Sequence, residues 1–155
     1  MTQPTCADLV VDQWERTREA LQAFQNDDLT NEDGTELGEY GLSFDFVEPN
    51  TFDDQPVGYW RYLMSWGGPA DEIRYNLDED SRYGLKIEYW YLQWFDGASV
   101  HLKGDDKELA MWVFGHHAPD IDPRTYQLKY LKGAGATRPP LSPHRIFSLS
   151  PAANL

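Results

Sequence analysis

Glu88 is the residue of this chain best placed to do chemistry. It stands in an aromatic segment, Ile87–Phe95, and a carboxylate buried among rings could act as a general acid. The competing interpretation is structural, because Glu88 could pair across a sheet with Arg61 or Arg74. The pattern favours the structural interpretation without excluding the chemical one.

An aromatic pocket between sheet and helices would make the protein a small-molecule binder or an enzyme. Glu88, Arg61, His101 and His116 are the candidate polar groups. No phosphate-binding loop, dinucleotide-binding glycine pattern or nucleophile elbow occurs, so an enzyme is the less favoured class. The tryptophans that would line such a pocket are Trp60, Trp66, Trp90 and Trp94.

Histidines and aspartates near residue 120 could bind a metal, but their spacing matches no metal-binding pattern. Adjacent histidines usually point apart, so we expect a solvated helix end, no metal site and no cofactor. The donors concerned are His116, His117, Asp120 and Asp122, and His101 or His144 would have to complete the site.

Negative charge is concentrated in the first half of the chain. The net charge is −13, and residues 1–80 hold 19 acids and four bases. No lysine or arginine occurs between Arg18 and Arg61, whereas 11 acids lie between Glu19 and Asp54. Such a surface repels nucleic acids and anionic membranes and attracts basic proteins. Ordinary solubility is the competing interpretation, because many cytosolic proteins are acidic.

The charge pattern favours a non-enzymatic protein-binding module that mimics nucleic acid. Its carboxylates would replace phosphates in the groove of a basic, nucleic-acid-binding host protein, such as a restriction or CRISPR effector. A regulatory partner that binds one protein without mimicry is a further alternative. The predicted partner-binding residues are Asp27, Asp28, Glu32, Asp33, Glu36, Glu39, Asp45, Glu48, Asp53, Asp54, Asp78, Glu79 and Asp80.

Hydrophobic periodicity predicts an α+β fold. One antiparallel sheet of about four to five strands would carry an N-terminal helix and a second helix. A capping box at Thr5 and Asp8 precedes the first helix, which should run to about Phe24. The face expected to be buried comprises Val10, Trp14, Thr17, Leu21 and Phe24.

Four strands are predicted, at 40–47, 58–66, 71–77 and 85–95. Both faces of the fourth are largely apolar, so we expect it to be central and covered on both sides. Asp96-Gly97 predicts a hairpin turn after it, and a short loop into a helix at Ala98 is the alternative.

A second helix should follow from Asp105 or Asp106 to about Phe114, ended by Gly115. Residues 126–131 could form a strand or a short helix. We expect one domain over residues 1–132 and an extended, Gly/Pro-rich tail over 133–155.

Several segments resemble a group of small accessory proteins carried by plasmids and other mobile elements. They are YGLSFDFVEP from Tyr40, YLMSWGGP from Tyr62, DEIR from Asp71 and IEYWYLQWFDGA from Ile87. The resemblance implies an antagonist of host defence and supplies no catalytic residue. With one cysteine and no apolar run of about 20 residues, we expect a cytoplasmic protein without membrane contact.

Overall fold

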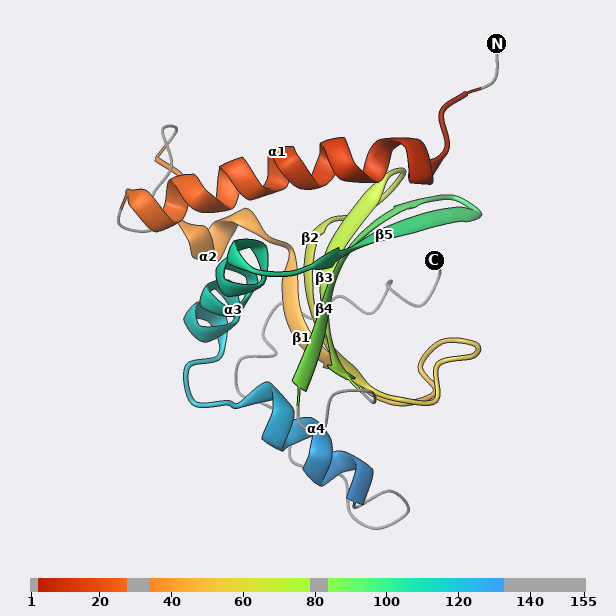
Figure 1. The fold of residues 1–155 in the computed structure, drawn as a ribbon, viewed down its shortest axis with the longest axis vertical. Coiled ribbons are helices and arrows are strands. Elements are labelled where there is room, and N and C mark those ends of the chain that lie inside the picture. The colour runs from red at the N-terminus through yellow and green to blue at the C-terminus, as the bar shows by residue number, and fades with distance from the viewer. Residues whose placement is uncertain (1–2, 28–33, 79–83, 133–155) are drawn as a thin grey trace.

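An antiparallel sheet of five strands organises the chain, with helices packed on one side of it (Figure 1). The computed structural model describes residues 3–27, 34–78 and 84–132, and for 78 and 128–132 it describes the backbone alone. The strand order is β1-β2-β3-β4-β5, which confirms the predicted α+β class. The strands are β1 (Ser43–Val47), β2 (Tyr59–Ser65), β3 (Ala70–Asp78), β4 (Gly84–Gln93) and β5 (Asp96–Leu102). The helices are α1 (Cys6–Asn26), α2 (Leu37–Tyr40), α3 (Asp105–His117) and α4 (Pro123–Lys132).

Helix α1 begins with the predicted capping box. The Asp8 amide donates to the Thr5 hydroxyl, and the amide and hydroxyl of Thr5 donate to the Asp8 carboxylate at 2.9 Å each. These hydrogen bonds lower the pKa of Asp8, because they favour its charged form. The helix packs on β4 and β5. Its predicted buried face is confirmed and comprises Val10, Trp14, Thr17, Leu21 and Phe24.

The alternating aromatic face of β2 lies in the core. Trp60, Tyr62 and Met64 are all buried. The Trp60 ring stacks on Phe44 of β1 at 5.6 Å and meets Phe114 of α3 edge-on at 5.5 Å. Aromatic contacts of this kind add to the stabilisation from buried area alone, so ring contacts join α3 to the paired strands β1 and β2.

Strand β4 is not the central strand, and its two faces are unequally covered. It lies next to the edge strand β5, and β3 is the middle strand. On the helix side Ile87 and Tyr89 are fully buried, whereas Glu88, Trp90 and Leu92 on the other side are only half-buried. The expectation of a central strand covered on both sides was therefore wrong. The large side chains on the half-exposed face made both faces of this strand look apolar in the sequence.

The helices at the C-terminal side of the sheet also differ in detail from the expectation. Gly115 does not end α3, which continues to His117 and closes with a hydrogen bond from the Ala118 amide to the Phe114 carbonyl. A glycine weakens a helix interior but does not end it unless the chain turns there. Residues 126–131 lie within α4, so the helical alternative is the observed one.

The predicted hairpin between β4 and β5 is present, but its turn comes two residues early. Gln93 pairs with Asp96, which leaves Trp94 and Phe95 as the turn residues. Trp94 adopts a φ of 48°, the left-handed region that large side chains rarely occupy. Asp96 and Gly97 are the first residues of β5 instead of the turn.

Contacts with α1 and β4 explain why the turn is displaced. The Asp96 carboxylate accepts a hydrogen bond from the Cys6 amide at 2.7 Å, which ties the start of β5 to the first turn of α1. Gly97 lies close to Leu92, since a Cβ at residue 97 would come within 2.8 Å of the Leu92 Cδ2 atom and that side chain would have to shift. Both residues therefore have tertiary roles that local turn preference does not reveal.

Trp94→Ser together with Phe95→Ser should change the free energy of unfolding by only about 0.5 kcal/mol, because both rings are exposed. Trp60→Ala is the matched core substitution and should cost about 3–5 kcal/mol, since it empties a fully buried ring site. Urea unfolding followed by circular dichroism measures both. A large loss in the double variant would contradict the exposed position of the turn.

Candidate functional site

A row of charged residues crosses the face of the sheet opposite the helices. Its members are register partners on successive strands, one from each of the five strands, so they lie side by side across the sheet. We call this set the charged row. It runs in the order Asp45, Arg61, Arg74, Glu88 and His101.

Asp45 and Arg61 form a buried ion pair at one end of the charged row. The Arg61 Nη2 atom lies 3.3 Å from each carboxylate oxygen of Asp45, and the two residues are only 4% and 2% exposed. Every residue of β1 is buried, on both faces of the strand. Asp45 was predicted to bind a partner directly. This is corrected, because its carboxylate is buried and neutralised by Arg61.

Arg74 lies between two aromatic rings and is neutralised by acids. Its guanidinium sits 4.3 Å from the ring centre of Trp90 and 5.2 Å from that of Tyr59, and its Nε donates to Glu72 at 2.8 Å. Burial alone would lower the pKa of Arg74, but the neighbouring Glu72 and Glu88 carboxylates outweigh that effect and raise it. Arg74 is therefore a fixed positive charge with compensation close by.

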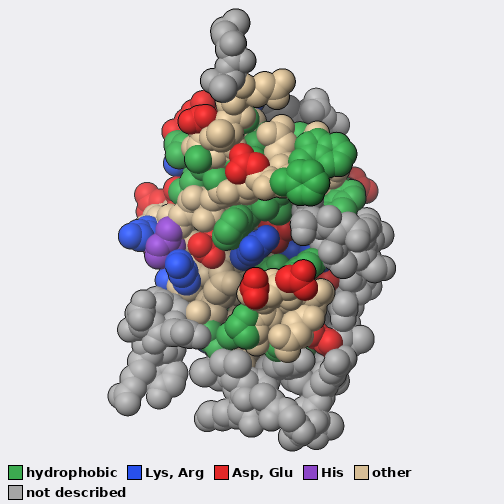
Figure 2. Space-filling view, turned by 90° about the vertical axis from the view of Figure 1, so that its right-hand side faces the viewer, with side chains coloured by type: hydrophobic (Ala, Val, Ile, Leu, Met, Phe, Trp, Pro, Cys, Tyr) green, Lys and Arg blue, Asp and Glu red, His purple; other side chains and the backbone are tan. Residues whose placement is uncertain are grey.

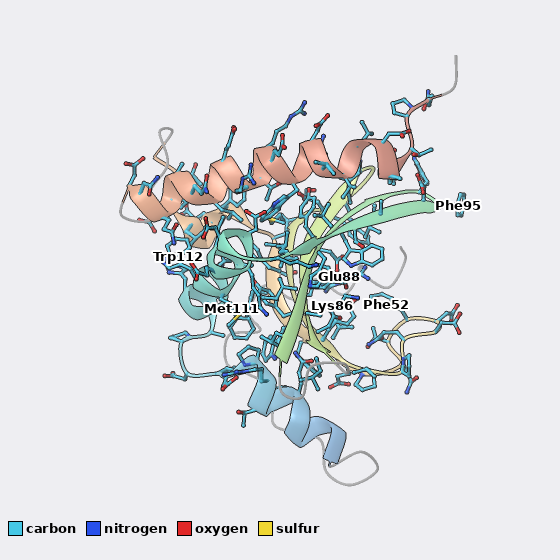
Figure 3. The ribbon with its side chains drawn as sticks, in the orientation of Figure 1. Phe52, Lys86, Glu88, Phe95, Met111 and Trp112 are labelled. Carbon is cyan, nitrogen blue, oxygen red and sulfur yellow. The ribbon has the colours of Figure 1, made fainter. Side chains whose placement is uncertain are left out.

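Glu88 takes part in this structural network. It is the register partner of Arg74, as one of the two structural alternatives proposed, and its Oε1 accepts a hydrogen bond from the Asn76 amide at 3.1 Å. Figure 3 shows its side chain on the sheet side away from Met111 and Trp112 of α3. The geometry gives Glu88 a role in holding Arg74 and Asn76.

The four tryptophans proposed to line a pocket beside Glu88 do not gather around it. Trp60 is fully buried on the helix side of the sheet, whereas Trp90 lies on the opposite side over Arg74. Trp94 is 80% exposed at the hairpin turn, and Trp66 is half-buried just after β2. A pocket that uses all four rings is therefore not formed.

The segment between β1 and β2 is a loop shaped by one amide side chain. We call residues 48–57 the Gln55 loop. The Gln55 side-chain oxygen accepts from the amides of Thr51 and Phe52 at 3.0 and 3.1 Å. Its nitrogen donates to the carbonyls of Glu48 and Val57 at 3.1 and 2.8 Å. Four hydrogen bonds to one side chain fix the path of the loop from inside.

Two predicted partner-binding residues lie at the tip of this loop. Asp53 and Asp54 are both exposed, and Asp54 has a left-handed φ of 55°. Within the described part of the chain, neither carboxylate makes an ion pair. The loop therefore holds two uncompensated negative charges in a fixed backbone conformation.

A hollow of about 260 Å³ lies between the Gln55 loop and the sheet, which we call the Arg74 hollow. Burial raises the pKa of Tyr59, one of its walls, to about 12, so the phenol is neutral at physiological pH. Its apolar walls are Phe52, Tyr59 and Leu92, and its charged groups are Asp53, Asp54, Glu72 and Arg74.

The remaining described acids of the prediction lie elsewhere. Asp27, Glu36 and Glu39 are exposed at the C-terminal end of α1 and around α2, on the far side of the molecule from the Gln55 loop (Figure 1). Glu48 is half-buried at the start of that loop, where its carbonyl accepts hydrogen bonds. The described carboxylates thus form two separate groups. Outside the described side chains lie Asp28, Glu32, Asp33, Asp78, Glu79 and Asp80.

The predicted metal donors point in different directions. His117 Nδ1 lies 2.9 Å from the Val113 carbonyl, and its ring stacks on Phe44. His116 is exposed and stacks on Trp112 instead. In residues 3–27, 34–78 and 84–132 no three His, Cys, Asp or Glu side chains come close enough to hold a metal ion.

Asp71 forms a polar cluster that the sequence analysis did not identify. Its carboxylate accepts hydrogen bonds from the hydroxyls of Ser65 and Tyr89, the latter at 2.7 Å, and lies 3.5 Å from the Thr17 hydroxyl. Burial, and then the Asp71 charge, raise the pKa of Tyr89, so its hydroxyl stays a donor. The cluster joins α1 to three parts of the sheet. The sequence did contain one indication of this cluster. Asp71 and the buried Ile73 are two residues apart on one strand, so their side chains point to the same face of the sheet.

The hairpin turn is a second feature that sequence reasoning missed. Trp94 and Phe95, which we call the aromatic tip, are 80% and 104% exposed. Figure 2 shows large hydrophobic rings on the face toward which the hairpin and the Gln55 loop project. Exposed aromatic pairs are uncommon away from binding surfaces. The sequence did not reveal this exposure, because both residues fall within the strand predicted at 85–95.

Comparison with known proteins finds no match among protein-family models, curated proteins or solved structures. The resemblance to accessory proteins of mobile elements therefore stays a prediction. Across the described helices, none combines the length and apolar character needed to span a bilayer.

Arg61→Met should lower the free energy of unfolding by about 3–5 kcal/mol, because it leaves the Asp45 carboxylate buried without its cation. Adding Asp45→Val should restore part of that loss, since no charge then remains buried. Urea unfolding of both variants measures the difference. A double variant less stable than the single one would contradict this account.

Gln55→Ala should loosen the Gln55 loop without unfolding the sheet. The Phe52 amide loses its acceptor, so its hydrogen exchange should accelerate at least about tenfold, while the Trp60 amide exchanges as before. The Thr51 amide keeps its 3.2 Å hydrogen bond to the Glu48 carbonyl, so its exchange should accelerate less. Gln22→Ala, at an exposed position of α1, is the matched control and should leave all three amides unchanged. Unaltered exchange in the Gln55 variant would show that the loop is held by other contacts.

Proposed function

We propose that this protein is a non-enzymatic module that binds a basic protein. The observation that carries the proposal is a pair of exposed carboxylates, Asp53 and Asp54, which make no ion pair with any described residue and lie on a loop whose shape is fixed by Gln55. A preordered loop loses little conformational freedom on binding, so more of the interaction energy is retained as affinity.

The surrounding charge supports a basic partner. Residues 1–80 carry 19 acids and four bases, and the structure uses two of these bases, Arg61 and Arg74, to neutralise acids inside the protein. The remaining field is negative, which accelerates encounter with positively charged surfaces. Association should therefore weaken as salt concentration rises.

Within this proposal, the partner is a protein that otherwise holds nucleic acid, such as a restriction or CRISPR effector. Carboxylates on the loop would occupy lysine and arginine side chains that contact phosphates. The two described acidic groups lie on opposite sides of the molecule. The Gln55 loop is therefore proposed as the main contact, and a continuous row of carboxylates along a duplex-like path is not required.

The test uses immobilised protein and lysate of its source organism at about 50 mM and about 200 mM salt. A basic protein retained at the lower concentration should be largely lost at the higher one. After purification, that protein should release the module when duplex DNA or RNA is added. Retention that does not change with salt, or that nucleic acid does not affect, would contradict the proposal.

Asp53→Asn with Asp54→Asn should weaken binding of the retained partner at least about tenfold, because the change removes two charges and keeps side-chain size. Asparagine also tolerates the left-handed backbone of residue 54. Asp120→Asn, at an exposed site far along the chain, removes one charge and should have little effect. Equal losses in both variants would assign the effect to net charge alone.

A further inference from the structure

The Arg74 hollow has the size of a side-chain pocket. Its volume of about 260 Å³ lies below the roughly 300–1,000 Å³ of pockets that take drug-sized ligands. The Gln55 loop, which forms one wall of the hollow, projects toward the face that Figure 2 shows. A single long side chain fits such a space better than a cofactor or a polymer.

The charges around the hollow favour a cation. Arg74 contributes one positive charge, but Glu72 contacts it at 2.8 Å and Glu88 faces it across the strands. Asp53 and Asp54 have no ion-pair partner within the described residues. The net field in the hollow is therefore negative although an arginine lines it.

The walls suit a cation with an apolar stem. Phe52 and the neutral Tyr59 present aromatic rings, and Leu92 adds an aliphatic surface. Aromatic faces attract ammonium and guanidinium groups, while the methylenes of lysine and arginine pack against apolar surface. The Tyr59 ring already attracts one guanidinium, because Arg74 sits 5.2 Å from its ring centre.

We propose that the Arg74 hollow is a socket for one lysine or arginine side chain of the partner. The proposal rests on the proposed function and names the contact at which the basic partner is anchored. The ammonium or guanidinium group would lie against Asp53 and Asp54, and the stem would lie along Phe52 and Leu92. Gln55 holds the loop side of the socket in place before binding.

The test titrates the isotopically labelled full chain with small probes. Nα-acetyl-arginine amide and Nα-acetyl-lysine amide distinguish the two cations, and Nα-acetyl-citrulline amide has the arginine shape without its charge. At least one cation should bind with a dissociation constant of the order of millimolar. Saturable amide shifts should centre on Phe52, Asp53 and Tyr59. Citrulline should bind at least about tenfold more weakly.

Substitutions test which residues bind the cation. Asp53→Asn with Asp54→Asn, and separately Phe52→Ala, should each weaken the cation at least about threefold, whereas Asp120→Asn should not. The amide spectrum of each variant shows whether the fold is kept. If only Phe52→Ala misfolds, the asparagine variant still decides the outcome.

Three results would overturn the socket. Citrulline could bind as well as arginine, an anion such as Nα-acetyl-glutamate amide could produce the shifts through Arg74, or neither cation could shift these amides. Partner retention without any of the expected cation shifts would reject the socket and keep the proposed function. Cation binding at these residues without a salt-sensitive partner would support the socket and reject the proposed function.

Discussion

The ring of Phe44 fixes how the sheet meets the helices. It lies 5.1 Å from Phe114 of α3, 5.6 Å from Trp60 and 6.3 Å from Tyr75. Successive residues of a strand point to opposite faces, so this packing directs the next residue, Asp45, away from the helices. The packing of the aromatic core thereby also determines that the charged row lies on the opposite face of the sheet.

The charged row therefore lies on a face of the sheet that is itself partly buried. A cation taken out of water is stable only beside an anion, and removing either partner is costly. Arg61 pairs with Asp45 across the strands, and Arg74 pairs with Glu72 two residues earlier on the same strand, so each arginine has an acid on the same face of the sheet. Exposed acids outside these two pairs include those on the Gln55 loop and around α2. Internal neutralisation and external negative charge are thus two results of one arrangement.

Much of the fold could be predicted because it depends on local patterns. The buried face of α1, the alternation of Trp60 and Tyr62 and the presence of a hairpin after β4 all follow from spacing. The predictions were wrong where contacts between residues distant in the sequence determine the local structure. Asp96 lies outside the turn because it binds Cys6, and the second face of β4 is half-open although it carries the large apolar side chains Trp90 and Leu92.

The candidate site could be predicted only in part. The chain between Arg18 and Arg61 showed that Asp53 and Asp54 belong to an acidic region, but not that Gln55 would hold them in place. The hydrogen bonds of that glutamine run to backbone atoms, which have no sequence signal. Burial of Asp45 was equally hidden, because a strand pattern does not reveal which of its faces is covered.

In the Gln55 loop, the residue that determines the backbone shape differs from the residues that present charge to solvent. Its hydrogen bonds join a side chain to the backbone and do not involve the Asp53 or Asp54 carboxylates. Residue 53 can therefore change freely during evolution, and residue 54 can vary among types that accept a left-handed backbone. A lineage that meets a new partner could alter its recognition at these positions while the rest of the chain stays the same.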